Sequence, residues 1–235
     1  KMHNSINNNF PASSGSKALD HFKQYAGFYI PYIIFVVIFI GLIINNQKAD
    51  LHLWLNSFNS PSADVFFHYY TNVGGSIPYW IIGGFLFYRY RLAFFLLITQ
   101  LASGLFSQFM KQTWNEPRPI KYFADNYPNI QLHQVLGEHL HSSHSFPSGH
   151  TITAFAFFLA LAFFTKKPLL HFLYFILALL VGLSRIYLSQ HFALDVLVGS
   201  LIAVAVTVSW QFYYEKLPLK WADGSLRDVF YKKNR

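Results

Sequence analysis

Two histidines, His150 and His191, and one aspartate, Asp195, are the residues of this sequence best suited to chemistry. His191 and Asp195 are four residues apart, so on a helix they would share one face. An aspartate beside a histidine can hold the ring in one tautomer, as the aspartate of a Ser-His-Asp triad does. Of two histidines in one site, one can attack an electrophile while the other protonates the leaving oxygen. These residue types leave open which histidine attacks.

The stretch SHSFPSGHTITAFAFF, Ser143–Phe158, joins turn residues to an apolar run. Pro147 suits the first turn of a helix, where its missing N–H costs nothing. Ser148, Gly149 and His150 would then present free backbone N–H groups at a helix start, which is partly positive and binds phosphate. Gly149 would let a ligand approach the backbone closely. The stretch therefore predicts an anion site at the mouth of an apolar helix.

Three cations, Lys111, Arg118 and Arg185, lie at or near the ends of apolar segments on one predicted membrane face. An ionisable group within a membrane span is costly and is a functional-site hypothesis by default. A lone lysine can instead snorkel to the interface, which is the alternative for Lys111. Guanidinium forks match the oxygens of phosphate. The three cations are therefore expected to bind the same anion as the predicted helix start.

The elements that must position these residues are membrane helices. The chain has 235 residues, of which 53% are hydrophobic and 12% charged, whereas about a quarter are charged in typical soluble domains. A helix needs ~20 apolar residues to cross a bilayer. We therefore expect an all-α integral membrane bundle of six transmembrane helices with an outer-face active site. The expected spans are Gly27–Ile44, Ile77–Tyr88 with a start further back near Tyr70, Leu92–Met110, Thr151–Phe164, Leu169–Leu188 and Phe192–Tyr214.

Lysines and arginines are concentrated on one side of these spans, and the positive-inside rule assigns that side to the cytoplasm. The basic segments are therefore topology signals, and no nucleic acid partner is expected. We expect a disordered cytoplasmic N-terminus over residues 1–24, a membrane domain over residues 25–214 and a basic cytoplasmic tail over residues 215–235. The first apolar run, near Tyr25, lacks a small-residue cleavage site, so no cleavable signal peptide is expected. The segment Ala49–Phe58 is expected to lie flat at the interface.

Three motifs in this chain resemble those of the type-2 phosphatidic acid phosphatase (PAP2) superfamily, in its integral membrane lipid phosphatase branch. The first is KQTWNEPRP, a lysine followed after six residues by Arg-Pro, and the second is PSGH. The third is SRIYLSQHFALD, which is Ser-Arg, five residues, His, three residues and Asp. The motifs run from Lys111 to Asp195, about a third of the chain, and no motif position departs from the family pattern.

The resemblance implies a role for each motif residue. His191 would be the nucleophile that forms a phosphohistidine, which the spacing to Asp195 also favours, and Asp195 would orient it. His150 would be the general acid and then the base that activates water. The residues expected to bind phosphate are Lys111, Arg118, Ser148, Gly149 and Arg185. The family works without a metal, and no cofactor is expected.

A site at headgroup depth on the outer face predicts a substrate that keeps its tails in the bilayer. The phosphate-binding motifs do not choose among undecaprenyl diphosphate, phosphatidylglycerol phosphate, phosphatidate and lipid A. The location suits a bacterial inner membrane. The alternatives are a lipid phosphotransferase using the same intermediate, a vanadate haloperoxidase, against which six spans argue, and a non-catalytic phospholipid transporter. The oligomeric state is unknown from the sequence.

The loop from Ile120 to Ser145 is the expected selectivity element. It contains Glu138 and four histidines, His133, His139, His141 and His144. Their spacing would permit a metal site, but we favour loop histidines without a metal.

Overall fold

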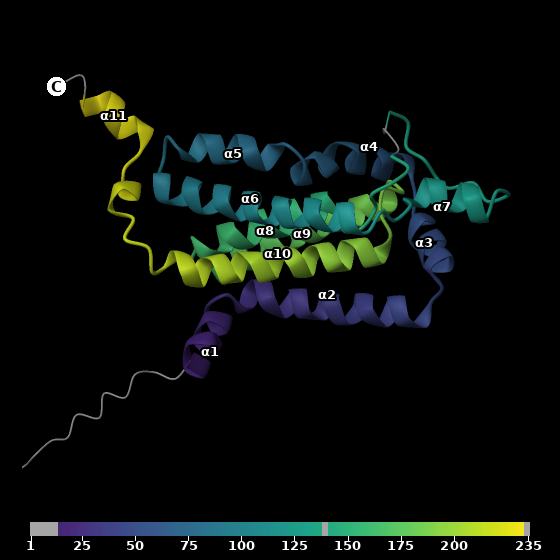
Figure 1. Cartoon of the computed structure of the whole chain (residues 1–235), viewed down its shortest axis with the longest axis horizontal. Coiled ribbons are helices and arrows are strands. Elements are labelled where there is room, and N and C mark those ends of the chain that lie inside the picture. Colours follow the sequence, from purple (N-terminus) through teal and green to yellow (C-terminus); the bar gives the residue numbers. More distant parts are fainter. Residues whose placement is uncertain (1–13, 138–140, 233–235) are drawn as a thin grey trace, which may run out of the picture.

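The computed structural model describes residues 14–137 and 141–232, and every regular element among them is a helix. The long helices run side by side along one axis and form a bundle (Figure 1). The elements are α1 (Ser14–Gln24), α2 (Ala26–Asn45), α3 (Lys48–Asn56), α4 (Pro61–Tyr70), the 3₁₀ turn η1 (Thr71–Gly74), α5 (Ile77–Phe85), α6 (Tyr90–Thr113), α7 (Pro119–Asn126), α8 (Gly149–Phe163), α9 (Pro168–Tyr187), α10 (Ala193–Tyr214), η2 (Lys220–Asp223) and α11 (Leu226–Lys232).

Helix α8 occupies the centre of the bundle, packed against α6, α9 and α10. Its apolar residues face all sides of the helix, and a helix of this kind is stable only in a protein core or in a membrane. Phe155, Ala156 and Leu159 are all completely buried. Because α8 begins at Gly149, the central position of this helix also places the PSGH motif at one end of the core.

Within the described residues, four helices are long and apolar enough to cross a membrane by length and composition: α2, α6, α9 and α10. Helix α8 is apolar but has only 15 residues. These five helices match five of the expected spans, with ends that differ by at most three residues. The expected all-α membrane bundle is confirmed, whereas the count of six crossings stays a prediction.

The remaining expected span is not one continuous helix starting near Tyr70. Helix α4, the turn η1 and helix α5 follow one another along the bundle (Figure 1), with an irregular backbone at Gly75. The break brings η1 against the start of α8. A Cβ atom on Gly74 would lie 2.6 Å from the carbonyl oxygen of His150 and 2.5 Å from Val181 Cγ1. A residue without a side chain is therefore required where the two backbones meet.

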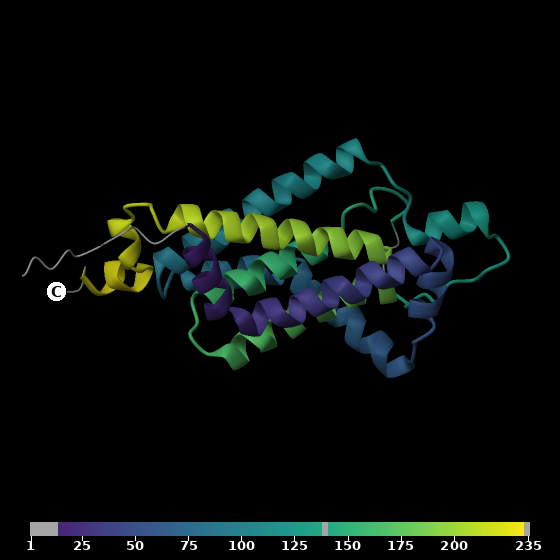
Figure 2. The same cartoon turned by 90° about the horizontal axis from the view of Figure 1, so that it is seen from below.

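The two ends of the bundle differ. Helix α3 lies across one end, beside α7 and the loop that follows it (Figures 1 and 2), and the interfacial position expected for Ala49–Phe58 stays a prediction. Helices α1 and α11 lie at the opposite end. There the C-terminal segment is fixed to α6 by the Arg91–Asp223 ion pair of 2.9 Å and by the hydrogen bond from Tyr90 N to Gly224 O.

The structure differs from the expectation at residues 14–24, which form helix α1 instead of a disordered segment. Aromatic side chains of this short stretch contact other helices of the chain, which the composition does not reveal. His21, for example, contacts the rings of Tyr25 and Phe163 and hydrogen-bonds Tyr29 at 3.0 Å. Residues 1–13 lie outside the described residues.

Candidate active site

The start of α8 is built from Ser148, Gly149 and His150. Ser148 is the N-cap, because its hydroxyl accepts hydrogen bonds from the N–H of Thr151 (3.4 Å) and from the Thr151 hydroxyl (2.8 Å). Pro147 therefore precedes the N-cap and does not occupy the first helical turn, contrary to the expectation. The N–H of Ser148 donates to the carbonyl oxygen of Asp195 (3.0 Å) and is not free for a ligand.

The two N–H groups left at this helix start are those of Gly149 and His150. No group among the described residues accepts a hydrogen bond from either of them. They lie at the positive end of the helix dipole, where an anion is stabilised. Lys111 reaches the same place from the end of α6, because a Cβ atom on Gly149 would lie 3.5 Å from its Nζ atom. The helix start and a cation therefore face one small region.

The two arginines are buried and held by polar contacts. Arg118, which precedes α7, donates from Nε to the carbonyl oxygen of Ser143 (3.0 Å) and from Nη1 to Oε1 of Gln190 (2.8 Å). Arg185, in the last turn of α9, donates from Nη1 to the hydroxyl of Thr71 (2.5 Å). These contacts fix the planes of both guanidinium groups before any ligand arrives.

His191 and Asp195 lie at the start of α10, and both are buried. The Nδ1 atom of His191 is 3.5 Å from Oδ2 of Asp195. This carboxylate oxygen also accepts from the N–H of Phe192 (2.9 Å) and from the hydroxyl of Ser145 (2.5 Å). Burial lowers the pKa of His191 well below its ordinary value of 6.5 and outweighs the opposing effect of the Asp195 carboxylate. The ring is therefore neutral near pH 7 and has a nitrogen lone pair available.

His150 lies in a polar pocket of about 400 Å³. The other residues that line this pocket are His68, Thr71, Asn72, His141, Arg185 and Gln190. The Nε2 atom of His150 is directed toward η1, since a Cβ atom on Gly75 would lie 3.4 Å from it. The pocket provides space for a polar group next to both His150 and Arg185.

All eight residues singled out by the motifs thus lie at the same end of the bundle: Lys111, Arg118, Ser148, Gly149, His150, Arg185, His191 and Asp195. The sequence did not identify three further residues that contact them, Ser145, Gln190 and Thr71. Gln190 lies within the third motif and Ser145 lies two residues before the second. A polar residue in or next to a motif could have been predicted to support the site. Thr71 is 114 positions from its partner Arg185 and carries no such signal.

Two of the loop histidines that the structure describes, His133 and His144, have different partners. His133 bonds Asp64 at 2.7 Å, whereas the Nδ1 atom of His144 lies 3.1 Å from the hydroxyl of Ser143. His139 and Glu138 lie outside the described residues. Among the residues that are described, no three His, Asp or Glu side chains are grouped so that they could hold a metal ion.

Comparison with known proteins places this geometry in a family. The profile of the PAP2 superfamily matches residues 92–217, more than half of the chain. The crystal structure of LpxE from Aquifex aeolicus superposes with a TM-score of 0.62 at 26% identity and covers 73% of this chain and 99% of that one.

Two curated relatives come from Bacillus subtilis. Phosphatidylglycerophosphatase B is 32% identical over 44% of this chain and 59% of its own length. Undecaprenyl-diphosphatase BcrC is 33% identical over 49% of this chain and 53% of its own length. The chain spans about half the length of the curated relatives it matches. Because the family profile covers all three motifs and the fold agrees, the chain belongs to the PAP2 superfamily.

Proposed function

We propose that this protein is a metal-independent membrane phosphatase that removes a phosphate from a lipid phosphate or diphosphate. The observation that carries the proposal is the contact of a buried, neutral His191 with the carboxylate of Asp195, beside a helix start that Lys111 faces. Phosphoryl transfer through a covalent intermediate needs a nucleophile, a carboxylate that orients it and a site that binds the anionic phosphoryl group.

In the first step, a lone pair on Nε2 of His191 attacks phosphorus, while Nδ1–H faces Asp195. The P–O bond to the lipid breaks, and His150 donates its proton to the departing oxygen. Lys111, Arg118 and Arg185, with the N–H groups of the α8 start, stabilise the charge on the equatorial phosphoryl oxygens. The Nδ1–Oδ2 distance of 3.5 Å exceeds an ordinary hydrogen bond, and such contacts commonly shorten when substrate binds.

In the second step, water attacks the phosphohistidine. His150, now neutral, takes a proton from that water, the P–N bond breaks and inorganic phosphate leaves. The Nε2 lone pair of His191 is thereby restored. Ser148 contributes by capping α8, so that the N–H groups of Gly149 and His150 remain directed at the phosphate.

The substrate class follows from the position of the site. We place residues 25–214 in a bacterial inner membrane as one phosphatase domain, with six crossings and both termini in the cytoplasm. The basic tail over residues 215–235 then lies at the cytoplasmic end, together with α1. The site lies at the other end of the bundle, at headgroup depth on the outer face, so the lipid tails stay in the bilayer.

The relatives phosphatidylglycerophosphatase B and undecaprenyl-diphosphatase BcrC support lipids of these two classes. The polar pocket beside His150 accommodates a polar leaving group, which both classes could present. A phosphotransferase would use the same intermediate and differ only in passing the phosphoryl group to a second lipid.

The test is phosphate release by the purified protein in detergent, from a panel of lipid monophosphates and diphosphates with matched tails. We expect phosphate release from at least one lipid, unchanged by a chelator and inhibited by vanadate. The His191→Ala variant should be inactive on all of them. Absence of release from every lipid, with transfer to an added acceptor lipid, would favour the phosphotransferase. Absence of both reactions would favour the transporter.

A further inference from the structure

Helix α9 ends in a turn that an unusual residue makes possible. The N–H of Gln190 donates to Arg185 O (2.9 Å) and the N–H of Ser189 donates to Ile186 O (3.0 Å). This pair of bonds defines a Schellman motif, in which the first residue after the cap adopts a left-handed conformation and is usually glycine. Here that residue is Ser189, with φ +51°. A residue with a side chain keeps this conformation only where its surroundings enforce it.

The same turn carries part of the active site. Arg185, three residues before the cap residue Leu188, accepts a second hydrogen bond on its carbonyl oxygen from the N–H of His191 (3.1 Å). Gln190 lies between them and binds the guanidinium of Arg118 through its side chain. A shift of the turn would therefore displace the proposed nucleophile relative to Lys111 and the start of α8.

Two buried side chains of α3 hold Ser189. Asn56, the last residue of α3, donates from Nδ2 to the hydroxyl oxygen of Ser189 (3.2 Å) and to the carbonyl oxygen of Tyr187 (2.9 Å). His52 Nε2 lies 3.3 Å from the same hydroxyl. Asn56 thus contacts the residues on both sides of the helix cap, Tyr187 and Ser189.

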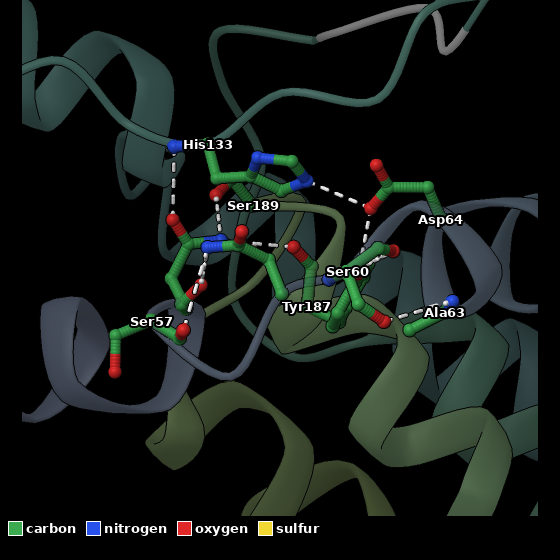
Figure 3. Close-up of polar contacts among 9 residues, drawn as sticks. Ser57, Ser60, Ala63, Asp64, His133, Tyr187 and Ser189 are labelled. Atoms are coloured by element: carbon green, nitrogen blue, oxygen red, sulfur yellow. Dashed lines mark hydrogen bonds and ion pairs between the residues drawn. The ribbon is translucent and has the colours of Figure 1, made fainter.

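A second layer of contacts surrounds this one. Asp64, in the first turn of α4, accepts hydrogen bonds from the Tyr187 hydroxyl and from Nε2 of His133, the latter at 2.7 Å. The backbone N–H of His133 donates to Oδ1 of Asn56 (3.0 Å). Figure 3 shows the side chains of Asp64, His133 and Tyr187 directed toward one another from α4, the loop between α7 and α8, and the end of α9.

We propose that Asn56, Asp64 and His133 form a clamp that positions the turn carrying His191. None of the three belongs to the catalytic motifs, and each acts through Tyr187 or Ser189. The clamp couples the loop between α7 and α8 to the nucleophile, because His133 of that loop contacts both Asn56 and Asp64. The inference rests on the proposed role of His191 as the nucleophile.

The experiment compares three variants of Asp64 and Asn56 with a matched control. Asn56→Ala and Asp64→Ala remove the two central members, whereas Asp64→Asn keeps an oxygen that can accept from Tyr187. Asp50→Ala is the control, because Asp50 is an exposed carboxylate in the first turn of the neighbouring helix α3. Asp64 is partly exposed at the surface, so its variants are expected to fold even where Asn56→Ala does not.

The primary readout is the rate constant of phosphoenzyme formation under rapid quench, measured beside the inhibition constant of inorganic phosphate. Displacing a reacting group by about 1 Å can cost roughly a hundredfold in rate, so we expect losses of about tenfold to a hundredfold in Asn56→Ala and Asp64→Ala. The inhibition constant should change by less than about threefold, because Lys111 and the α8 start lie outside the clamp. Asp64→Asn should recover most of the rate, and Asp50→Ala should match the wild type.

A second readout does not depend on activity. Carbethoxylation of His191 by diethyl pyrocarbonate, followed by mass spectrometry, should be faster in the two alanine variants than in the wild type. Faster labelling of the two alanine variants, combined with a wild-type protein that forms no phosphoenzyme, would support the clamp and reject the proposed function. Unchanged labelling of both alanine variants, or equal rate losses in Asp64→Ala and Asp64→Asn, would overturn the clamp.

Discussion

The Ser145→Ala variant, which removes one hydroxyl group, should form the phosphoenzyme more slowly than the loss of packing around a buried serine would cause. Ser145 is completely buried, and its hydroxyl donates to Oδ2 of Asp195 at 2.5 Å. A hydrogen bond to a charged group contributes about 1.5–3 kcal/mol, which corresponds to a rate factor of about 10 to 150 if it is lost only in the transition state. Asp195 keeps the N–H of Phe192 as a donor, so we expect the lower part of that range, about tenfold to fiftyfold.

The assay is rapid quench with labelled lipid phosphate, with thermal stability measured in parallel. Ser200→Ala is the matched control, because Ser200 is also a buried serine, with its hydroxyl bonded to Leu197 O of its own helix. Both variants should lose similar stability, and only Ser145→Ala should lose rate at unchanged apparent affinity. A rate for Ser145→Ala within about twofold of the wild type, or an equal loss in Ser200→Ala, would refute the role of the Ser145 hydroxyl in orienting Asp195.

Three further predictions follow from the structure. Gly149→Ala should fold normally, because the added Cβ meets no atom closer than 3.5 Å. Its methyl group enters the proposed phosphate site at the start of α8 and should raise the inhibition constant of phosphate. Gly74→Ala, whose Cβ would lie 2.5 Å from another atom, should instead lower the melting temperature. Burial lowers the pKa of His52 from 6.5 to about 4, so the unfolded chain takes up a proton at a higher pH than the folded protein. Stability should be full above pH 6.5 and fall as the pH drops toward 4, and this fall should be smaller in His52→Gln when thermal unfolding is followed against pH. A membrane-impermeant thiol reagent applied to intact cells should label a cysteine placed at Asn129 and not one at Gly224, and the reverse pattern would contradict the proposed topology.

The helices were predictable where an apolar run determines both the element and its burial. The spans expected at Gly27–Ile44 and Leu169–Leu188 correspond to α2 and α9 with ends shifted by only one residue. The segment that begins at Pro61 was not predicted, because Gly74 and Gly75 break it where η1 meets α8. That break depends on a tertiary contact, which local composition does not encode.

The motif residues were predictable because their chemistry depends on short spacings, such as the separation of four positions between His191 and Asp195. Their supporting contacts were not. Asp64 precedes its partner His133 by 69 positions, and neither residue has a local pattern that pairs it with the other. His133 was considered only as a loop histidine or a metal ligand. Its contact with Asp64 depends on where the loop between α7 and α8 lies on α4, and this follows from the fold.

The central claim is that His191 carries the phosphoryl group. It is tested most directly by reacting the protein with a labelled lipid phosphate or an activated aryl phosphate, quenching within milliseconds, denaturing at high pH and locating the label by mass spectrometry. A phosphoramidate is acid-labile and alkali-stable, so we predict alkali-stable label on His191 and none in His191→Ala. In His150→Ala the label should accumulate with the activated substrate, because water then lacks its base. Label retained in His191→Ala, or found on His150 in the wild type, would contradict the assignment.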